Sequence, residues 1–329
     1  MKLLKKLLKK IIIWIEIRKI KKKNKLNKNT IINKKGVKNN SVKTVKKLKS
    51  LKVNKKKKSI VNYLFYAPIA VFSLIFLLSI GKIIIWSIEK ISVDKTMDDI
   101  NNMVVIEEVV DNKEETLPEE EKKEEVKKEE SIYDTYKKIN LINVDFNKLK
   151  ELNSATVGWI QVNGTEVNYP IVRALDNEFY LHRDFNDNYN SAGWIFMDYR
   201  NDPNNLDKNT IIYGHNRMDN IMFGTLMNTL KKSWFNNKDN HYVKLSTPTE
   251  NSVWQVFSVY YIKATSDYIQ TEFINDSDYL DFINLIKGRS VHNFNLDVSS
   301  NDKIITLSSC YSKTERLVVH AKLVNSQAR

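Results

Sequence analysis

The only cysteine of the 329 residues ends an apolar run, and an arginine follows it six positions later. Cys310 closes the run that begins at Ile304, and Arg316 precedes a second run, Leu317 to Val324. A thiolate is a strong nucleophile, and a nearby cation favours that form of the thiol. The pattern therefore indicates possible nucleophilic chemistry. The alternative is a free cysteine that is buried as a small hydrophobic residue.

One of the five histidines has the setting expected of a catalytic side chain. His215 follows the apolar run Thr210 to Gly214 and precedes a polar loop, so a buried strand would deliver it to a loop through a glycine that permits a sharp turn. Ordinary structural roles explain the other four, which are His182 and His292 in polar connections, His241 at a strand start, and His320 within the last strand.

Cys310, His215 and Arg316 together meet three requirements of acyl transfer. The thiolate can attack a carbonyl carbon, and a protonated imidazole can donate a proton to a leaving amine. A guanidinium stays charged and can stabilise the developing oxyanion. For metal binding, by contrast, histidines, cysteines and carboxylates lack a cluster with ligand spacing, so we expect no metal and no other cofactor.

The chain's charge is strongly divided. Residues 1–58 contain 24 of the 53 basic residues and a single acidic one, Glu16, which gives this tail a net charge of +23. The remaining residues contain 29 basic and 38 acidic groups, so the rest of the protein is mildly acidic. The overall charge of +14 therefore does not indicate a nucleic-acid-binding protein.

An uncharged stretch from Ser59 to Gly81 is long enough to cross a membrane as a helix. We expect a single transmembrane helix at 59–89, with the lysine-rich residues 1–58 in the cytoplasm and the catalytic domain outside. The run Ile11 to Ile15 is too interrupted for a cleaved signal peptide. The leucine and lysine pattern at the start predicts either a helix that lies on the inner leaflet, so that residues 1–88 contact membrane lipids, or a solvated tail.

Residues 90–131 are rich in glutamate and lysine and predict a charged extracellular stalk without an apolar face. Residues 132–329 then form the catalytic domain. A single cysteine rules out an internal disulfide in this domain, which raises the question of what the thiol does on the oxidising side of a membrane.

Short strands dominate the predicted domain and favour a mainly β fold, a closed or nearly closed barrel. The Asn163-Gly164 dipeptide predicts a hairpin turn. Helices are expected at Met222–Lys231 and at Asp278–Lys287, the latter capped by Asp276 or Ser277 and stopped by Gly288. The expected strands are Val157–Val162, Val167–Val172, Gly193–Met197, Thr210–Tyr213, Tyr242–Leu245, Val253–Ile262, Lys303–Leu307 and Leu317–Val324.

The segment Thr306–Cys310 with Arg316, preceded by Tyr213-Gly214-His215, resembles the active-site signature of the sortases, membrane-anchored cysteine transpeptidases of Gram-positive bacteria. The resemblance covers about residues 133–325 and is greatest to class B, which has N-terminal helices and a helix before the cysteine strand. The sequence motifs that resemble those of class B are Gly158–Ile160, Asn168–Val172, Ile195–Asp198, Tyr213–Asn216 and Met222–Gly224.

This resemblance implies a role for each site residue. Cys310 would be the nucleophile, His215 the general acid and base, and Arg316 the donor to the oxyanion. Ser308, Tyr268, Ile269 and Tyr213 would line the groove for the substrate peptide. The implied reaction cleaves a C-terminal sorting motif of secreted proteins after threonine, forms a thioacyl intermediate, and transfers it to an amine of a peptidoglycan precursor or crossbridge.

Three features depart from the family pattern. The six-residue spacing from Cys310 to Arg316 is short for class B, Ser309 replaces a common threonine, and the 58-residue tail is long. Two other functions remain open, a surface cysteine protease that only hydrolyses and a non-enzymatic cell-wall adhesin with a structural cysteine.

Overall fold

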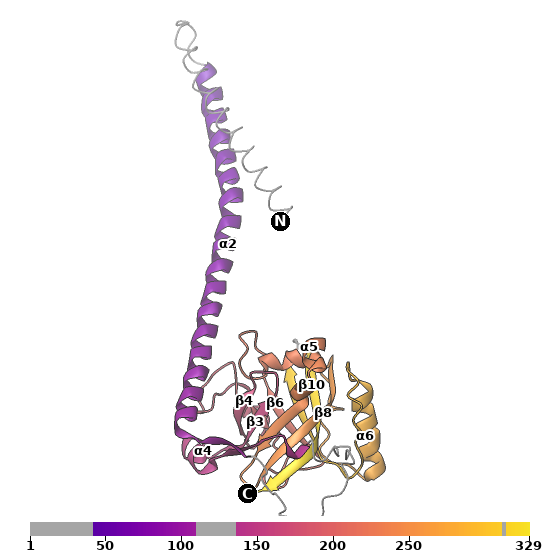
Figure 1. Ribbon diagram of the computed structural model, residues 1–329. Helices are drawn as coiled ribbons and strands as arrows, with labels where there is room; N and C mark the ends of the chain where they lie inside the picture. The colour runs from indigo at the N-terminus through magenta and orange to yellow at the C-terminus, as the bar shows by residue number, and fades with distance from the viewer. Residues whose placement is uncertain (1–41, 110–135, 311–313) are drawn as a thin grey trace, which may run out of the picture. The chain divides into compact units, whose positions relative to one another are not determined.

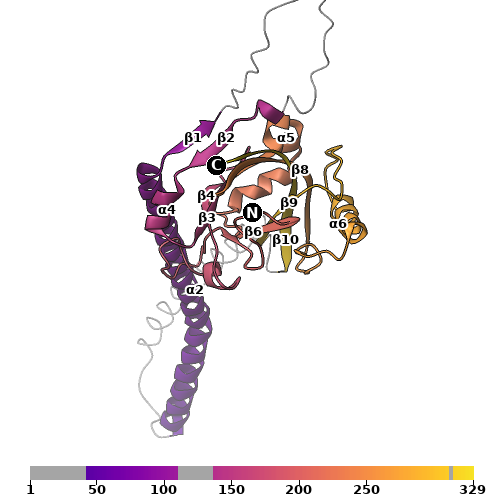
Figure 2. The same ribbon diagram turned by 90° about the horizontal axis from the view of Figure 1, so that it is seen from below.

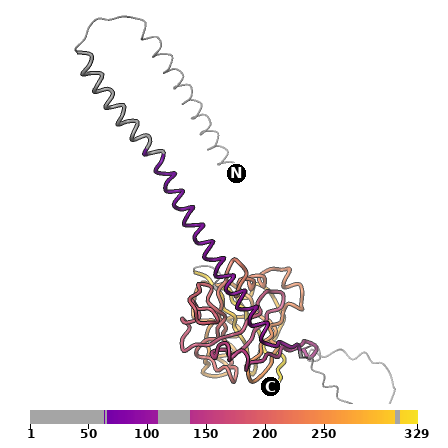
Figure 3. Tube along the Cα trace, turned by 90° about the vertical axis from the view of Figure 1, so that its left-hand side faces the viewer, coloured from indigo at the N-terminus to yellow at the C-terminus, as the bar shows by residue number. Residues whose placement is uncertain are grey.

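The computed structural model describes residues 42–109, 136–310 and 314–329. The chain divides into two compact units, Met1–Ser79 and Ile80–Arg329. The described residues of the first unit all belong to α2 (Val42–Met103), a continuous helix whose last part belongs to the second unit (Figure 3). The leucine and lysine pattern at the start of the tail lies outside the described residues.

By length and composition, α2 is a candidate membrane-spanning helix. The candidate segment is Tyr66–Met103, whose most apolar window has a mean hydropathy of 2.4 and is not buried within the protein. Large apolar side chains such as Phe72 and Leu77 are exposed along it. This surface is suited to a hydrocarbon environment.

Eight strands of the second unit close into a barrel, in the order β10-β8-β7-β3-β4-β5-β6-β9 (Figure 1). The predicted mainly β, barrel-forming fold is therefore confirmed. The pairs β4–β5 and β6–β9 are parallel and the other paired strands are antiparallel. The strands are β3 (Thr156–Val162), β4 (Asn168–Val172), β5 (Phe196–Met197), β6 (Asn209–Gly214), β7 (Tyr242–Ser246), β8 (Glu250–Lys263), β9 (Ile304–Cys310) and β10 (Glu315–Ala328).

The hairpin predicted at Asn163-Gly164 joins β3 to β4. The Val162 amide donates to the Val167 carbonyl at 3.0 Å and closes the turn. Gly164 has a φ of 71°, and a Cβ there would lie 2.5 Å from the Asn240 side chain. Both the left-handed backbone and the lack of space require glycine.

Helix α6 (Asp276–Gly288) covers the outside of the barrel beside β8 (Figure 1). It buries Phe282, Ile283 and Ile286 in a second hydrophobic cluster that includes Val318, whereas the neighbouring Leu317 and Val319 of β10 face the main core. Full burial of each such side chain stabilises the fold by about 1.5–3 kcal/mol. The alternation along β10 thus fills the barrel and attaches the helix.

The cap of α6 differs from the prediction. The Asn275 side chain accepts from the Asp278 amide at 3.0 Å, whereas Asp276 and Ser277 already lie within the helix. Asn275 has extended backbone angles, which is the conformation of a capping residue.

The helix predicted from Met222 to Lys231 is present over a shorter range and in a different form. This segment forms the 3-10 helix η2 (Gly224–Leu230), followed by the short α5 (Lys232–Asn236). Met222 has a φ of 54°, which a right-handed helix cannot contain. The remaining short elements are α4 (Phe146–Leu152), η1 (Phe179–Leu181) and η3 (Lys238–His241).

Residues 90–109 differ from the expected stalk because they pack into the second unit. Val93, Ile100 and Val104 are almost fully buried. Strand β1 (Ile106–Val109) pairs with β2 (Leu141–Val144) beside α4 (Figure 2). The helical spacing of these three apolar residues within a polar sequence is the signal that the stalk interpretation overlooked. The remainder of the predicted stalk, 110–131, lies outside the described residues.

Candidate active site

Three adjacent barrel strands bring His215, Cys310 and Arg316 to one end of the sheet. The last pair in the parallel β6–β9 ladder is Gly214 with Ser309, and His215 and Cys310 each follow directly. Arg316 of β10 lies directly opposite Cys310 in the antiparallel β9–β10 ladder. The backbone register therefore aligns three residues that are up to 101 positions apart in sequence. The Cys310 side chain lies outside the described part of the chain, as do residues 311–313 of the predicted tight loop.

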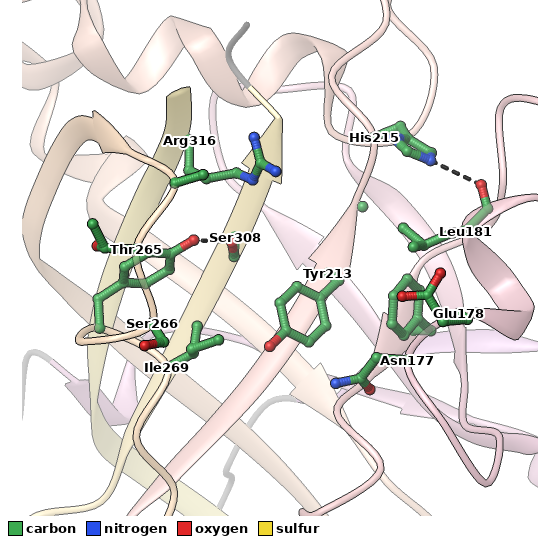
Figure 4. A pocket seen from close by; sticks show the side chains of 14 residues that line it. Asn177, Glu178, Leu181, Tyr213, His215, Thr265, Ser266, Ile269, Ser308 and Arg316 are labelled. Atoms are coloured by element: carbon green, nitrogen blue, oxygen red, sulfur yellow. Dashed lines mark hydrogen bonds between the residues drawn. The ribbon is translucent and has the colours of Figure 1, made fainter. Parts of the chain in front are cut away.

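A cavity of about 560 Å³ lies at this end of the barrel. His215 and Arg316 lie on opposite sides of it, with Tyr213 and Ser308 between them (Figure 4). All four residues predicted to bind the peptide, Tyr213, Ser308, Tyr268 and Ile269, line this cavity. The sequence prediction missed further lining residues, which are Asn177, Glu178, Leu181, Phe196, Gly214, Ala264, Thr265 and Ser266.

Most of the missed residues belong to two loops. Asn177, Glu178 and Leu181 come from the segment between β4 and β5, and residues 264–266 follow β8. The only local signal is Asp176, whose carboxylate accepts from the Glu178 and Phe179 amides and starts η1. Such a turn predicts local structure but does not indicate which cavity the loop reaches.

His215 is held by the loop that contains η1. Its Nε2 lies 2.8 Å from the Leu181 carbonyl oxygen, and its ring stacks on His182 with centroids 6.2 Å apart. Burial lowers the pKa of His215 below its usual value, and the bond to Leu181 offsets part of this effect. The Leu181 contact therefore fixes the orientation of the ring at the cavity.

Gly214 is required for space and not for the sharp turn that the sequence suggested. It ends β6, and a Cβ at this position would overlap the Ile195 side chain and lie 2.8 Å from Phe223. Close packing of these two side chains around the strand end fixes the backbone that precedes His215.

On the opposite wall, Tyr268 and Ser308 are connected. The two hydroxyl oxygens lie 3.0 Å apart, and both side chains are buried. Arg316 Nη1 donates to the Glu315 carbonyl at 3.0 Å, and its side chain is partly exposed at the cavity. This wall of the cavity therefore contains two connected hydroxyl groups and a partly exposed cation.

Asp198, which the sequence analysis did not single out, connects three parts of the cavity wall. Its fully buried carboxylate accepts from the Tyr213 hydroxyl at 2.9 Å and the Asn177 amide at 3.1 Å. Arg200 donates to the same carboxylate at 2.7 Å and to the Ile269 carbonyl at 3.0 Å. Burial alone would raise the pKa of Asp198, but the bonds from Arg200 and Tyr213 outweigh it and lower that pKa.

Comparison with known proteins supports one family. The sortase domain profile matches residues 160–324. Sortase B of Staphylococcus aureus is 40% identical over 192 residues, which is 56% of this chain and 76% of that protein. Sortase B of Listeria monocytogenes is 38% identical over 191 residues, 55% of this chain and 74% of that protein.

Solved structures agree with this result. A Staphylococcus aureus sortase B–substrate complex is 40% identical, with a TM-score of 0.51 over 54% of this chain and 83% of that one. A Clostridium perfringens sortase B mutant is 34% identical, with a TM-score of 0.52 over 55% and 86% of the two chains. A sortase B complexed with triglycine is 39% identical, with a TM-score of 0.52 over 54% and 84%.

The barrel, the aligned residues and these matches define a sortase-type cysteine transpeptidase, and the chain belongs to the sortase family. Within that family its relatives are class B enzymes.

Proposed function

We propose that this protein cleaves a C-terminal sorting motif of secreted proteins after threonine and transfers the acyl group to a cell-wall peptidoglycan amine. The main support is the strand register, which places His215, Cys310 and Arg316 at one end of three neighbouring strands. The solved relatives described as a substrate complex and as a triglycine complex support a peptide donor and an amine acceptor.

In the first half of the proposed reaction, the Cys310 thiolate attacks the carbonyl carbon of the threonine in the sorting motif. Arg316 donates hydrogen bonds to the oxyanion. The C–N bond then breaks, the leaving amine takes a proton from the His215 imidazolium, and a thioester to Cys310 remains.

In the second half, neutral His215 accepts a proton from the acceptor amine as its nitrogen attacks the thioester carbonyl. The tetrahedral intermediate expels the Cys310 thiolate and leaves a new amide bond. The lowered pKa of His215 suits this role as a base, because it increases the neutral fraction near pH 7.

We further propose that residues 59–89 cross the membrane once, with residues 1–58 in the cytoplasm and the catalytic unit outside. The lysine-rich flank supports this orientation. The anchor would hold the enzyme beside secreted substrates and membrane-attached wall precursors.

The test uses the full chain in lipid nanodiscs with a panel of sorting pentapeptides, with and without triglycine, and product masses as the readout. We expect a ligated product with triglycine and no product from Cys310→Ala. Replacing His215 with Asn should lower the rate roughly 10²- to 10⁴-fold. The matched control is His292→Asn, a histidine outside the cavity, which should retain activity.

Cleavage by Cys310→Ala would contradict the proposed nucleophile. Hydrolysis without ligation at saturating amine would instead support a cysteine protease that transfers acyl groups only to water.

A further inference from the structure

A second cavity, of about 630 Å³, lies apart from the active site. Part of its lining comes from α2 and part from the loop between β4 and β5, about 100 residues later. The lining residues are Lys82, Ile83, Ile85, Trp86, Glu89, Tyr189 and Ser191. Its apolar members are exposed: Ile83 is 65% exposed, Trp86 41% and Tyr189 78%.

The two sides of this cavity are fixed to each other by a buried ionic cluster. Glu89 accepts from Arg217 at 2.8 Å and from the Ser191 hydroxyl at 2.8 Å. The Arg217 guanidinium also lies over the Trp86 ring, 4.9 Å from its centroid. Because Glu89 and Arg217 are largely shielded from water, these contacts join α2 near Trp86 to the loop at Ser191, two residues after Tyr189.

The residue types at this cavity match those of a membrane interface. It follows the uncharged stretch of α2, which ends at Gly81, and it contains the next two charged residues of the helix, Lys82 and Glu89. The helix would leave the hydrocarbon at this level. Tryptophan and tyrosine concentrate at the level of lipid headgroups, and a lysine at the end of a span can extend its amine to the phosphates. Three such residues, Lys82, Trp86 and Tyr189, line one cavity here.

We propose that this cavity binds a membrane phospholipid and that Tyr189 is an interfacial contact of the catalytic unit. The acyl chain would run along Ile83 and the apolar residues that precede it, and the Lys82 amine would extend toward the headgroup phosphate, at the level of Trp86 and Tyr189. The proposal rests on the membrane anchoring given under Proposed function. It favours lipid over a protein partner because the cavity is continuous with the candidate membrane span.

This contact would also set the position of the active site above the membrane. The loop that carries Tyr189 contains Asn177, Glu178 and Leu181 of the active-site wall. Arg217, which holds α2, stands two residues after His215. A lipid contact at Tyr189 would therefore hold both the histidine and the peptide-binding cavity at a defined distance from the bilayer.

The unique native cysteine makes a direct test possible. Cys310→Ala gives a cysteine-free chain, into which single cysteines are introduced by Tyr189→Cys, Leu77→Cys and Ile274→Cys. Each full-length variant is labelled with the fluorophore NBD and reconstituted into phosphatidylcholine vesicles with or without brominated acyl chains. Leu77 reports on the span, and Ile274, which is 92% exposed on the catalytic unit, is the matched control.

We expect brominated lipid to quench the labels at 77 and 189, with the label at 189 quenched most by bromines near the headgroup, and to leave the label at 274 unchanged. Quenching at 77 without quenching at 189 would overturn the lipid contact while retaining the anchor. Absence of quenching at both 77 and 189 would overturn the anchor and the lipid contact together. Equal unfolding temperatures of the three labelled variants establish that they are folded alike.

Discussion

Arg217 and Glu89 form an ion pair of 2.8 Å although 128 positions separate them in the sequence. Their side chains are only 6% and 12% exposed, and Asp219 binds the same guanidinium at 2.7 Å. Arg217 also belongs to a tight loop in which the Phe223 amide donates to the His215 carbonyl at 3.0 Å. The ion pair thus joins α2 at Glu89 to the loop that begins with His215.

Replacing Glu89 with Gln should therefore reduce both stability and activity. Loss of one partner of a buried ion pair lowers the free energy of unfolding by about 3 kcal/mol. Because Asp219 still pairs with Arg217 in this variant, we expect a loss of at most that size. The control is Asp94→Asn on the same helix, which breaks an exposed pair with Lys90 and should change stability by less than about 1 kcal/mol. Thermal unfolding measures the stability and peptide turnover measures the activity. Equal stability and activity of the two variants would contradict a link between α2 and the His215 loop.

Asp198 should control peptide binding through the cavity walls. In Asp198→Asn, the amide can no longer accept from Arg200, Tyr213 and Asn177 together. We expect KM for the peptide to rise roughly tenfold, equivalent to about 1.4 kcal/mol, with a smaller loss of kcat.

A second variant tests the contact from Asp198 through Arg200 to Ile269 separately from the contacts to Tyr213 and Asn177. Arg200→Lys retains a positive charge near Asp198 but cannot reproduce the forked contact that also reaches the Ile269 carbonyl. Its KM should rise less than that of Asp198→Asn. Unchanged KM in both variants would show that Asp198 does not position the cavity.

His215 should titrate below its usual pKa, first because it is buried and then because His182, Arg217 and Arg316 add positive charge around it. Replacing His182 with Asn should move the His215 titration toward higher pH but leave it below the usual value, since burial persists. NMR of selectively labelled histidine measures the titration of His215 in the wild type and in the variant. A His215 titration at or above about pH 6.5 would contradict this environment.

His320 should make the fold less stable in mild acid. It is fully buried between the Tyr260 hydroxyl and Thr306, each 2.9 Å away, and burial lowers its pKa to about 3. In the unfolded chain a histidine binds a proton near pH 6.5, so stability is lost as pH falls from about 6.5 toward 3. At pH 5 this loss is about 2 kcal/mol.

Unfolding measurements at pH 7 and pH 5 test this assignment. His320→Gln removes the titrating group. The difference in the free energy of unfolding between pH 7 and pH 5 should therefore shrink by about 2 kcal/mol, even if the variant is less stable overall. The same pH dependence in the wild type and the variant would place its origin in other groups.

Local sequence patterns were sufficient for the barrel and for the three proposed catalytic positions. Alternating apolar runs predicted most of the strands, and the runs that end at Gly214 and Cys310 identified His215, Cys310 and Arg316 as candidates. These signals are local because strand formation and chain reversal depend on neighbouring residues. Where local geometry was less regular, as at Met222 and Asn275, the predicted helix start and the predicted cap residue were wrong.

The amino-acid sequence alone determined the apolar helix, the β-rich unit and the residue types available for acyl transfer. Only the tertiary structure decided which loops line the cavity, that Asp198 joins its walls, and that α2 packs against the His215 loop through Glu89 and Arg217. The physical reason is that these contacts join side chains far apart in the chain, and such contacts leave no periodic pattern in the sequence. Closure of the barrel is what brings them together.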